Sequence, residues 1–239
     1  VTVLVFTNTC TYQPSTGGTL NHAVTSHYDN GRYHLINSAN YAFGDNTYSL
    51  NFKPDSKRYS PIRQEIMDSF ITQLCAMQSH YSKIFAFRFD LSVPAGMPVA
   101  ESNQLISELF TRLRGKFTAK RWNGQPIKKF AYGWVREKEK AKQVHYHCWI
   151  ALPHFQVRVA GFGNEGTYGL INTLWSELTA QKGRSRPCNG TYTINRDDHS
   201  SLVALVERVS YLAKTRGKYS TGDGQRMFSA SKLKILTAA

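Results

Sequence analysis

Two histidines stand one residue apart in the segment QVHYHCWIAL, residues 143–152, which is otherwise rich in apolar, aromatic and β-branched residues. This composition predicts a β-strand, and because side chains alternate between the faces of a strand, His145 and His147 project from the same side. Two neutral imidazoles side by side can bind a metal ion. They can also be two hydrogen-bonded histidines on a half-exposed face. Other residues of the chain are needed to choose between these two interpretations.

An acidic residue, Glu137, ends the predicted strand that comes immediately before the histidine strand. The two strands should pair as a hairpin, in which directly opposed residues share a face. A register that sets Glu137 opposite His145 or His147 therefore brings all three side chains together. Two imidazoles and a carboxylate form an open site for Mn²⁺ or Mg²⁺, and such an ion would polarise a phosphate oxygen. Gln143 competes with Glu137 as the third ligand.

A tyrosine and a lysine form the second chemical motif, in the segment ERVSYLAKTRGK of residues 207–218. On the predicted helix, Tyr211 and Lys214 lie one turn apart, on the side away from the apolar stripe. A phenol is a poor nucleophile at its free pKa of about 10, but a metal-bound phosphate and a neighbouring ammonium make its attack feasible. Taken alone, the pair is more simply an exposed Tyr beside an exposed Lys.

The elements that must position these residues follow from the periodicity of the apolar side chains. A helix is predicted to begin at Ser60-Pro61, where Ser caps the helix and Pro occupies its first turn, and a strand follows at residues 82–93. The later elements are a helix at 99–118, strands at 128–137 and 143–152, a helix at 166–181, a strand at 190–195 and a helix at 199–215. This order predicts an α+β fold, with a central, mainly antiparallel sheet and helices packed on it.

The chain divides into three predicted regions. Residues 1–60 form a β-rich N-terminal extension, with a hairpin turn at Asn30-Gly31 and a strand at 48–52. Residues 61–230 form the main domain, and residues 231–239 a C-terminal tail. The four cysteines contain no CxxC pair and suggest neither a structural zinc site nor a disulfide framework, so a reducing cytosol is the simple expectation. No apolar run is long enough to span a membrane.

The balance of charge favours a polyanionic partner. The chain has 30 Lys and Arg against 16 Asp and Glu, a formal charge of +14, and 13% of its residues are aromatic. This combination suits single-stranded nucleic acid, although a basic protein can have the same composition without such a role. The expected DNA contacts are Arg88, Lys182, Arg184, Arg186, Arg216 and Lys218. Arg88 can equally form a structural ion pair with Asp90. There is no G-x-x-x-x-G-K-[ST] loop, so no ATPase motor is expected.

These motifs together resemble the HUH endonuclease superfamily, named for two His that flank a bulky apolar residue; the middle residue here is Tyr146, a mild departure. FRFDL at residues 87–91 resembles the first motif of the superfamily, and WVRE at 134–137 resembles the strand that supplies an acidic ligand. The nucleophile follows the histidines, as in replication initiators and single-tyrosine transposases. With its single tyrosine in YLAK, the series is most similar to the filamentous-phage (inovirus) gene-two-like replication proteins of prophages and phage satellites, over roughly residues 60–230.

The resemblance implies an HUH/RRM-like fold and an enzyme that nicks and joins single-stranded or melted origin DNA in the cytoplasm of a bacterial host. Tyr211 would attack a phosphodiester, become joined to the 5′ phosphate and release a 3′-hydroxyl that primes a polymerase. His145, His147 and Glu137 would hold Mn²⁺ or Mg²⁺, and Lys214 would neutralise or position the phosphate. Rejoining would need no ATP, and unwinding would need a separate helicase.

Two other functions fit the same residues. A single-tyrosine transposase would use the same site, and strand transfer between two cut ends would distinguish it from an initiator. In a non-catalytic nucleic-acid-binding module, the HYH and YLAK motifs would be accidental, and no covalent attachment to DNA would occur.

We predict that binding to single-stranded DNA weakens steeply with salt. Each phosphate that a Lys or Arg neutralises releases a counterion, so log K should fall against log salt with a slope of about −0.7 per contact. Fluorescence anisotropy of a labelled oligonucleotide over a series of KCl concentrations measures this slope. A flat response would contradict the phosphate contacts.

Overall fold

The structure is a computed structural model that describes residues 33–56, 58–59, 61–138, 143–218 and 224–236. Its strands in the central sheet are β5 (Lys83–Ser92), β6 (Ala131–Glu137), β7 (His145–Pro153), β8 (Arg184–Asn195) and β9 (Phe228–Ala230). They are antiparallel throughout and lie in the order β8-β5-β7-β6-β9. The helices are α1 (Gln64–His80), α2 (Val99–Ala119), α3 (Gly166–Leu178) and α4 (His199–Ser210), and α4 is followed by a 3₁₀ turn, η1 (Tyr211–Ala213).

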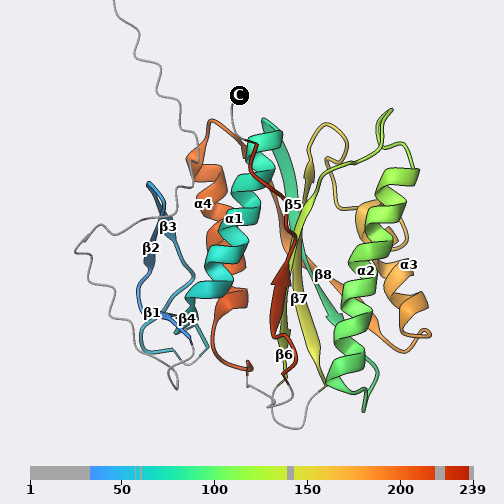
Figure 1. Cartoon of the computed structure of the whole chain (residues 1–239), viewed down its shortest axis with the longest axis horizontal. Coiled ribbons are helices and arrows are strands. Elements are labelled where there is room, and N and C mark those ends of the chain that lie inside the picture. Colours follow the sequence, from blue (N-terminus) through green and yellow to red (C-terminus); the bar gives the residue numbers. More distant parts are fainter. Residues whose placement is uncertain (1–32, 57, 60, 139–142, 219–223, 237–239) are drawn as a thin grey trace, which may run out of the picture.

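The helices cover both faces of the sheet. Figure 1 shows the sheet between two layers, with α1 and α4 on one face and α2 and α3 on the other. The predicted α+β fold with a mainly antiparallel sheet is therefore confirmed.

Alternate side chains of strand β5 point into two hydrophobic cores, one on each face of the sheet. Phe85, Phe87 and Phe89 belong to the core on the α2 and α3 side. Ile84 and Ala86, which alternate with them, belong to the core on the α1 and α4 side. Beyond Ala86 the α1 and α4 face of the strand becomes polar, because it carries the next alternate residues, Arg88 and Asp90.

Helix α1 begins at Gln64, later than predicted. Ile62 and Arg63 form β4 (Ile62–Arg63), which pairs antiparallel with β1 (Leu35–Ile36). Backbone pairing with the N-terminal segment thus holds these two residues extended and delays the helix; Ser60 lies outside the described residues.

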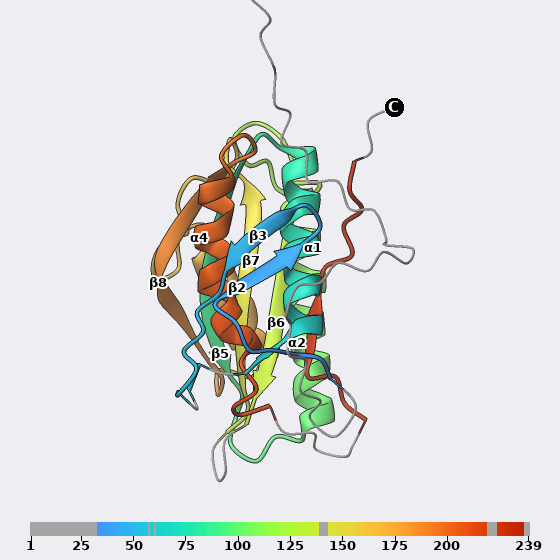
Figure 2. The same cartoon turned by 90° about the vertical axis from the view of Figure 1, so that its left-hand side faces the viewer.

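The described part of the N-terminal extension packs on the main domain. Its strands β2 (Asn40–Phe43) and β3 (Asn46–Ser49) form a hairpin that lies over α1 and α4 (Figure 2). Tyr48 and Leu50 join the core on that side, and the Tyr41 hydroxyl donates to Asp68 of α1. This described part of the extension therefore shares one core with the domain. The hairpin predicted at Asn30-Gly31 lies outside the described residues.

Two later elements differ in extent from the predictions. Strand β8 begins at Arg184 instead of residue 190, and it stays paired with β5 through an irregularity between Phe87 and Phe89. The α-helix predicted at 199–215 ends at Ser210, where the 3₁₀ turn takes over. In the part of the chain that the structure describes, no helix is both long and apolar enough to cross a membrane.

The C-terminal segment lies along α1. Ser231 Oγ and the backbone N–H of Leu233 both donate to Gln73 Oε1, at 2.7 and 2.8 Å. The backbone N–H of Leu236 donates to Ser79 Oγ at 2.8 Å. These bonds hold the segment that follows β9 against the helix layer.

We predict that Gly133→Ala destabilises the fold and that Gly115→Ala does not. A Cβ at Gly133 on β6 would overlap the rings of Phe70 and Trp149, whereas a Cβ at Gly115 on the exposed side of α2 meets no atom within 4 Å. Overpacking should lower the free energy of unfolding by about 1–3 kcal/mol. Gly115→Ala, in the middle of a helix, should raise the free energy of unfolding by about 0.5–1 kcal/mol. Urea denaturation of both variants measures the difference, and equal effects would contradict the packing described here.

Candidate functional site

Polar side chains from three neighbouring strands meet at one end of the sheet. Glu137 of β6 lies directly opposite His145 of β7, which confirms one of the two registers considered from the sequence. His147 lies directly opposite Asp90 of β5. Opposed residues share a face, and Trp149, two residues further along β7, packs in the core on the α1 and α4 side. Both histidines therefore face that side.

His147 lies between two carboxylates. Its Nδ1 is 2.7 Å from Asp90 Oδ1, and its Nε2 is 3.2 Å from Glu137 Oε2. Burial alone would lower the pKa of His147, but hydrogen bonds and attraction to Asp90 and Glu137 outweigh it and raise the pKa to about 9. The imidazole in this arrangement is thus protonated at neutral pH and donates to both carboxylates.

The Glu137 carboxylate binds three cationic groups. Besides His147, the Nζ atoms of Lys218 and Lys214 lie 2.8 and 3.5 Å from Glu137 Oε1. Burial alone would raise the pKa of Glu137, but these partners hold it well below its usual range. Burial also lowers the pKa of Lys218 to about 8, although Glu137 opposes that shift. Glu137 therefore ties β6 to the segment that follows η1.

Tyr211 lies beside this cluster, on η1. Its ring centroid is 3.6 Å from Lys214 Nζ and 5.7 Å from the guanidinium carbon of Arg88. Burial would raise the pKa of Tyr211, but hydrogen bonds with Lys214 and Arg58, and their charges, outweigh burial and lower the pKa. A lower pKa favours the phenolate, which is the nucleophilic form of the side chain.

The Tyr211 and Lys214 pair differs from the simple picture of two exposed neighbours on a helix. The α-helix has already ended at Ser210, and Lys214 is 5% exposed. The 3₁₀ turn directs Lys214 toward Glu137, so the lysine contacts both the tyrosine ring and the carboxylate.

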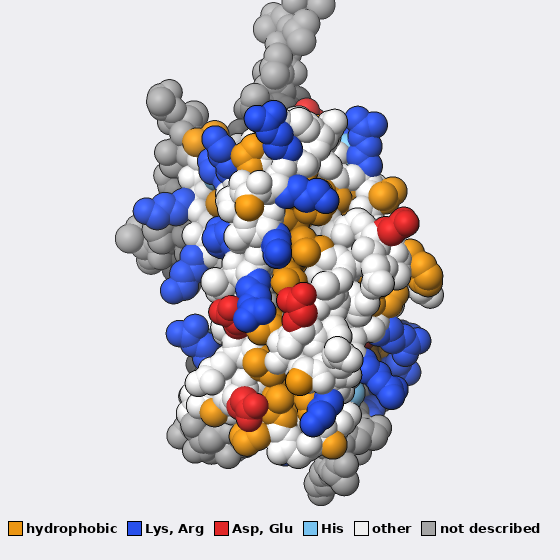
Figure 3. All heavy atoms as spheres, turned by 90° about the vertical axis from the view of Figure 1, so that its right-hand side faces the viewer, with side chains coloured by type: hydrophobic (Ala, Val, Ile, Leu, Met, Phe, Trp, Pro, Cys, Tyr) orange, Lys and Arg blue, Asp and Glu red, His pale blue; other side chains and the backbone are white. Residues whose placement is uncertain are grey.

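Four of the six expected DNA contacts are exposed: Lys182, Arg184, Arg186 and Arg216. Arg186 lies opposite Asp90, and Arg184 lies opposite Ser92, so both project from the site face of the sheet. Positive charge is also present elsewhere, because Lys and Arg are scattered over the face covered by α2 and α3 (Figure 3). The sheet register, more than the charge itself, associates Arg184 and Arg186 with the site.

The other two expected contacts, Arg88 and Lys218, are buried. Arg88 Nη2 lies 3.6 Å from Asp90 Oδ1, which is the ion pair that the sequence left open as an alternative. The Lys218 side chain is engaged by Glu137. In this arrangement both residues act on the carboxylates of the site.

The role of Asp90 was not anticipated from the sequence. Burial would raise the pKa of Asp90, but His147 and Arg88 outweigh it and lower the pKa. Asp90 orients the His147 ring through Nδ1. Only the pairing of β5 with β7 could have revealed this contact, and that register is not visible in either strand alone.

A divalent metal ion would fit the donor chemistry of this face if it displaced the proton on His147 Nε2, which here lies against Glu137. Within the described residues, no three His, Cys, Asp or Glu side chains already have an arrangement that would hold a metal ion. His145, His147 and Glu137 nevertheless share one face, and two imidazoles with a carboxylate suit such ions. Asp90 accepts from His147 Nδ1, as the outer carboxylate of a metal-binding histidine commonly would. Gln143, the competing ligand, is exposed just before β7.

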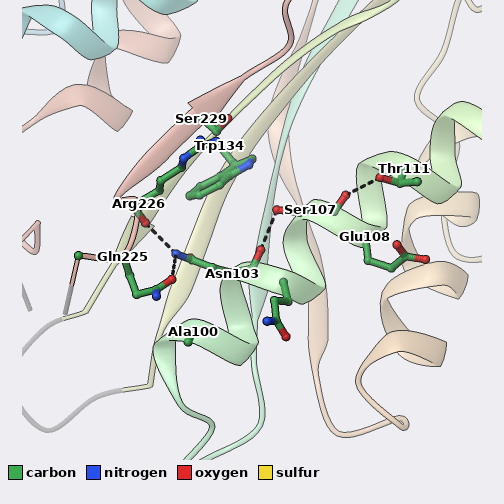
Figure 4. Close-up of a pocket in the computed structure, with 11 residues that line it drawn as sticks. Ala100, Asn103, Ser107, Glu108, Thr111, Trp134, Gln225, Arg226 and Ser229 are labelled. Carbon is green, nitrogen blue, oxygen red and sulfur yellow. Dashed lines mark hydrogen bonds between the residues drawn. The ribbon is translucent and has the colours of Figure 1, made fainter.

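A groove of about 540 Å³ lies on the opposite face, between α2 and the segment that leads into β9. Figure 4 shows its wall, where Asn103 donates to Gln225 and to the carbonyl of Arg226. Asn103 also accepts a hydrogen bond from Tyr146, the residue between the two histidines. The groove thus lies behind the histidine strand, and none of the expected site residues lines it.

The fold and site define an α+β protein with a buried histidine–carboxylate–lysine cluster beside a tyrosine. The chain belongs to the YagK/YfjJ C-terminal domain family, which matches residues 47–231 and so includes the whole site. It is 29% identical over 129 residues to "Uncharacterized protein YfjJ" of Escherichia coli (strain K12), and this match covers 49% of the chain and 62% of that protein. No solved structure matches the chain.

We predict that Asp90→Asn lowers the pKa of His147 from its value of about 9, because it removes one of the two negative charges that stabilise the imidazolium. An NMR titration of the metal-free protein measures the change. His154 follows the far end of β7 and provides an internal control, so its pKa should not move. An unchanged His147 pKa in a folded variant would show that Asp90 does not bond the ring in solution.

Proposed function

We propose that this protein is a metal-dependent endonuclease of the HUH type with an HUH/RRM-like Rep fold. It would nick and rejoin single-stranded or melted origin DNA through a 5′-phosphotyrosine and initiate rolling-circle replication of a phage-like or satellite element. One observation carries the proposal: Lys214 contacts both the ring of Tyr211 and the carboxylate of Glu137, which shares a sheet face with the two histidines.

Tyr211 is the proposed nucleophile. Its hydroxyl loses a proton to solvent, assisted by the lowered pKa, and the phenolate oxygen attacks the scissile phosphorus. The bond from phosphorus to the 3′ oxygen breaks, that oxygen takes up a proton, and Tyr211 remains joined to the 5′ phosphate. A 3′-hydroxyl reverses these steps when the strand is rejoined. No ATP is needed, because the phosphodiester bond energy is retained in the phosphotyrosine.

The cluster around Glu137 supports the phosphate during this exchange. His145, His147 and Glu137 would hold Mn²⁺ or Mg²⁺, and the bound ion would polarise a phosphate oxygen. Asp90 keeps the His147 ring oriented through Nδ1. Lys214 lies where its ammonium can neutralise charge that develops on the phosphate as Tyr211 attacks.

The expected partners follow from this chemistry. The exposed Lys182, Arg184, Arg186 and Arg216 would bind the phosphates of the strand on its way to Tyr211. The released 3′-hydroxyl would prime a polymerase, and a separate helicase would unwind the template. These partners are those of a replicon in the cytoplasm of a bacterial host.

We predict a covalent adduct between the protein and single-stranded DNA that requires metal and Tyr211. The protein is incubated with random-sequence and host-origin oligonucleotides and Mn²⁺, and the products are separated on a denaturing gel. The adduct should disappear with EDTA and in Tyr211→Phe, which lacks the attacking oxygen. Tyr132→Phe is the matched control, because Tyr132 stacks on Phe110 on the other face of the sheet.

Three results would contradict parts of this proposal. An adduct in Tyr211→Phe would show that another side chain is the nucleophile. No adduct on any oligonucleotide, together with normal salt-sensitive binding, would identify a nucleic-acid-binding module. Transfer between two cut ends would identify a transposase.

A further inference from the structure

A short segment outside the expected site, residues 53–59, places an aromatic ring and two cationic side chains near Tyr211. The ring centroid of Tyr59 lies 5.7 Å from that of Tyr211. Lys53 Nζ and the guanidinium carbon of Arg58 lie 5.0 and 5.5 Å from the Tyr59 ring centroid. The charge of Arg58 also acts on the Tyr211 side chain, whose pKa it lowers. We call Lys53, Arg58 and Tyr59 the Tyr59 platform.

The fold fixes the platform at this position. The backbone N–H of Asn51 donates to Ser210 Oγ at 2.8 Å, and Ser210 is the buried last residue of α4, adjacent to Tyr211. Leu50, one residue before Asn51, lies in the core. Two turns then fold the segment back, with bonds from Ser56 N to Lys53 O and from Tyr59 N to Ser56 O at 3.1 and 2.9 Å.

The cations of the platform differ from those of the Glu137 cluster in their exposure and in their partners. Lys218 and Lys214 are buried, and both are bonded to Glu137. Lys53 and Arg58 are exposed and contact aromatic rings. A cation over a ring keeps its charge available to a phosphate, and the ring beneath it can stack on a base.

We propose that the Tyr59 platform is the binding subsite for the nucleotide next to the scissile phosphate. This inference rests on the proposed function, because it takes Tyr211 as the residue that phosphate must reach. A base stacks on Tyr59 in place of one of the cationic side chains, and Arg58 and Lys53 then bind the flanking phosphates. Because Arg58 lies over Tyr59, whose ring is beside that of Tyr211, it would hold the phosphate near the attacking hydroxyl. The ligand class is single-stranded nucleic acid, recognised by stacking and charge.

The test measures binding separately from nicking. In the full chain carrying Tyr211→Phe, fluorescence anisotropy with labelled single-stranded oligonucleotides reports non-covalent affinity. Tyr59→Ala should weaken binding by about tenfold or more, and Tyr59→Phe, which keeps the ring, should not. Replacing Lys53 and Arg58 together by Gln should reduce the salt slope by about 0.7 for each charge removed.

A matched control and a folding check make the result decisive. Arg158→Gln removes an exposed charge beyond the far end of β7 and should leave affinity for a short oligonucleotide unchanged. Thermal melts establish that each variant is folded. If Tyr59→Ala does not fold, the exposed Lys53 and Arg58 replacements still test the subsite through the salt slope.

The outcomes separate this inference from the proposed function. Unchanged binding in Tyr59→Ala and in the Lys53 and Arg58 double replacement would overturn the subsite, even if the protein with Tyr211 intact forms its adduct normally. Ring-dependent binding without any adduct would support the platform as a nucleic-acid site and count against nicking. If Arg158→Gln lost as much affinity as the platform variants, the effect would come from the overall positive charge of the protein. That result would overturn the subsite.

Discussion

The buried Glu137 carboxylate is the interaction on which the rest of the site depends. It bonds His147 of β7 and both lysines of the segment after η1, so elements distant in the sequence meet at one side chain. A buried charge is tolerated only when it is paired, and Glu137 is paired with a histidine and two lysines. Lys214 connects this cluster to Tyr211, because its ammonium bonds Glu137 and also lies over the tyrosine ring.

Much of the fold could be predicted because its signals are local. Alternating side chains predicted β5 and β7 to within a few residues. They also predicted that the strands before and after residue 140 pair as a hairpin, but left two registers for Glu137, of which the pairing with His145 is found. The errors occur where non-local pairing overrides local preference. Pairing of β4 with β1 delays α1, and pairing with β5 extends β8 back to Arg184 through a stretch that contains Pro187.

The site also has a part that local sequence signals predict and a part that they do not. The sequence predicts that the two histidines, Glu137 and Tyr211 are site residues, because strand alternation and motif spacing single them out. The partners of His147 and Glu137 depend on tertiary contacts, so Asp90 and the buried position of Lys218 could not be read from spacing. Tyr146 is instructive, because a polar residue between two histidines departs from the HUH pattern. Its hydroxyl faces the other layer and is bonded 2.8 Å from Ser102 and Asn103, so it leaves the histidine face unchanged.

If the protein binds DNA as proposed, the distinction between buried and exposed cations also limits how a strand can approach. The net charge of +14 draws any polyanion to the protein but does not select a path over the surface. Arg88 and Lys218 are already bonded to carboxylates, so a phosphate would have to break those pairs to use them. Arg184 and Arg186 on β8 offer exposed charge on the site face, and Lys53 and Arg58 offer it beside Tyr211. A strand that used these exposed groups would leave the paired interior intact.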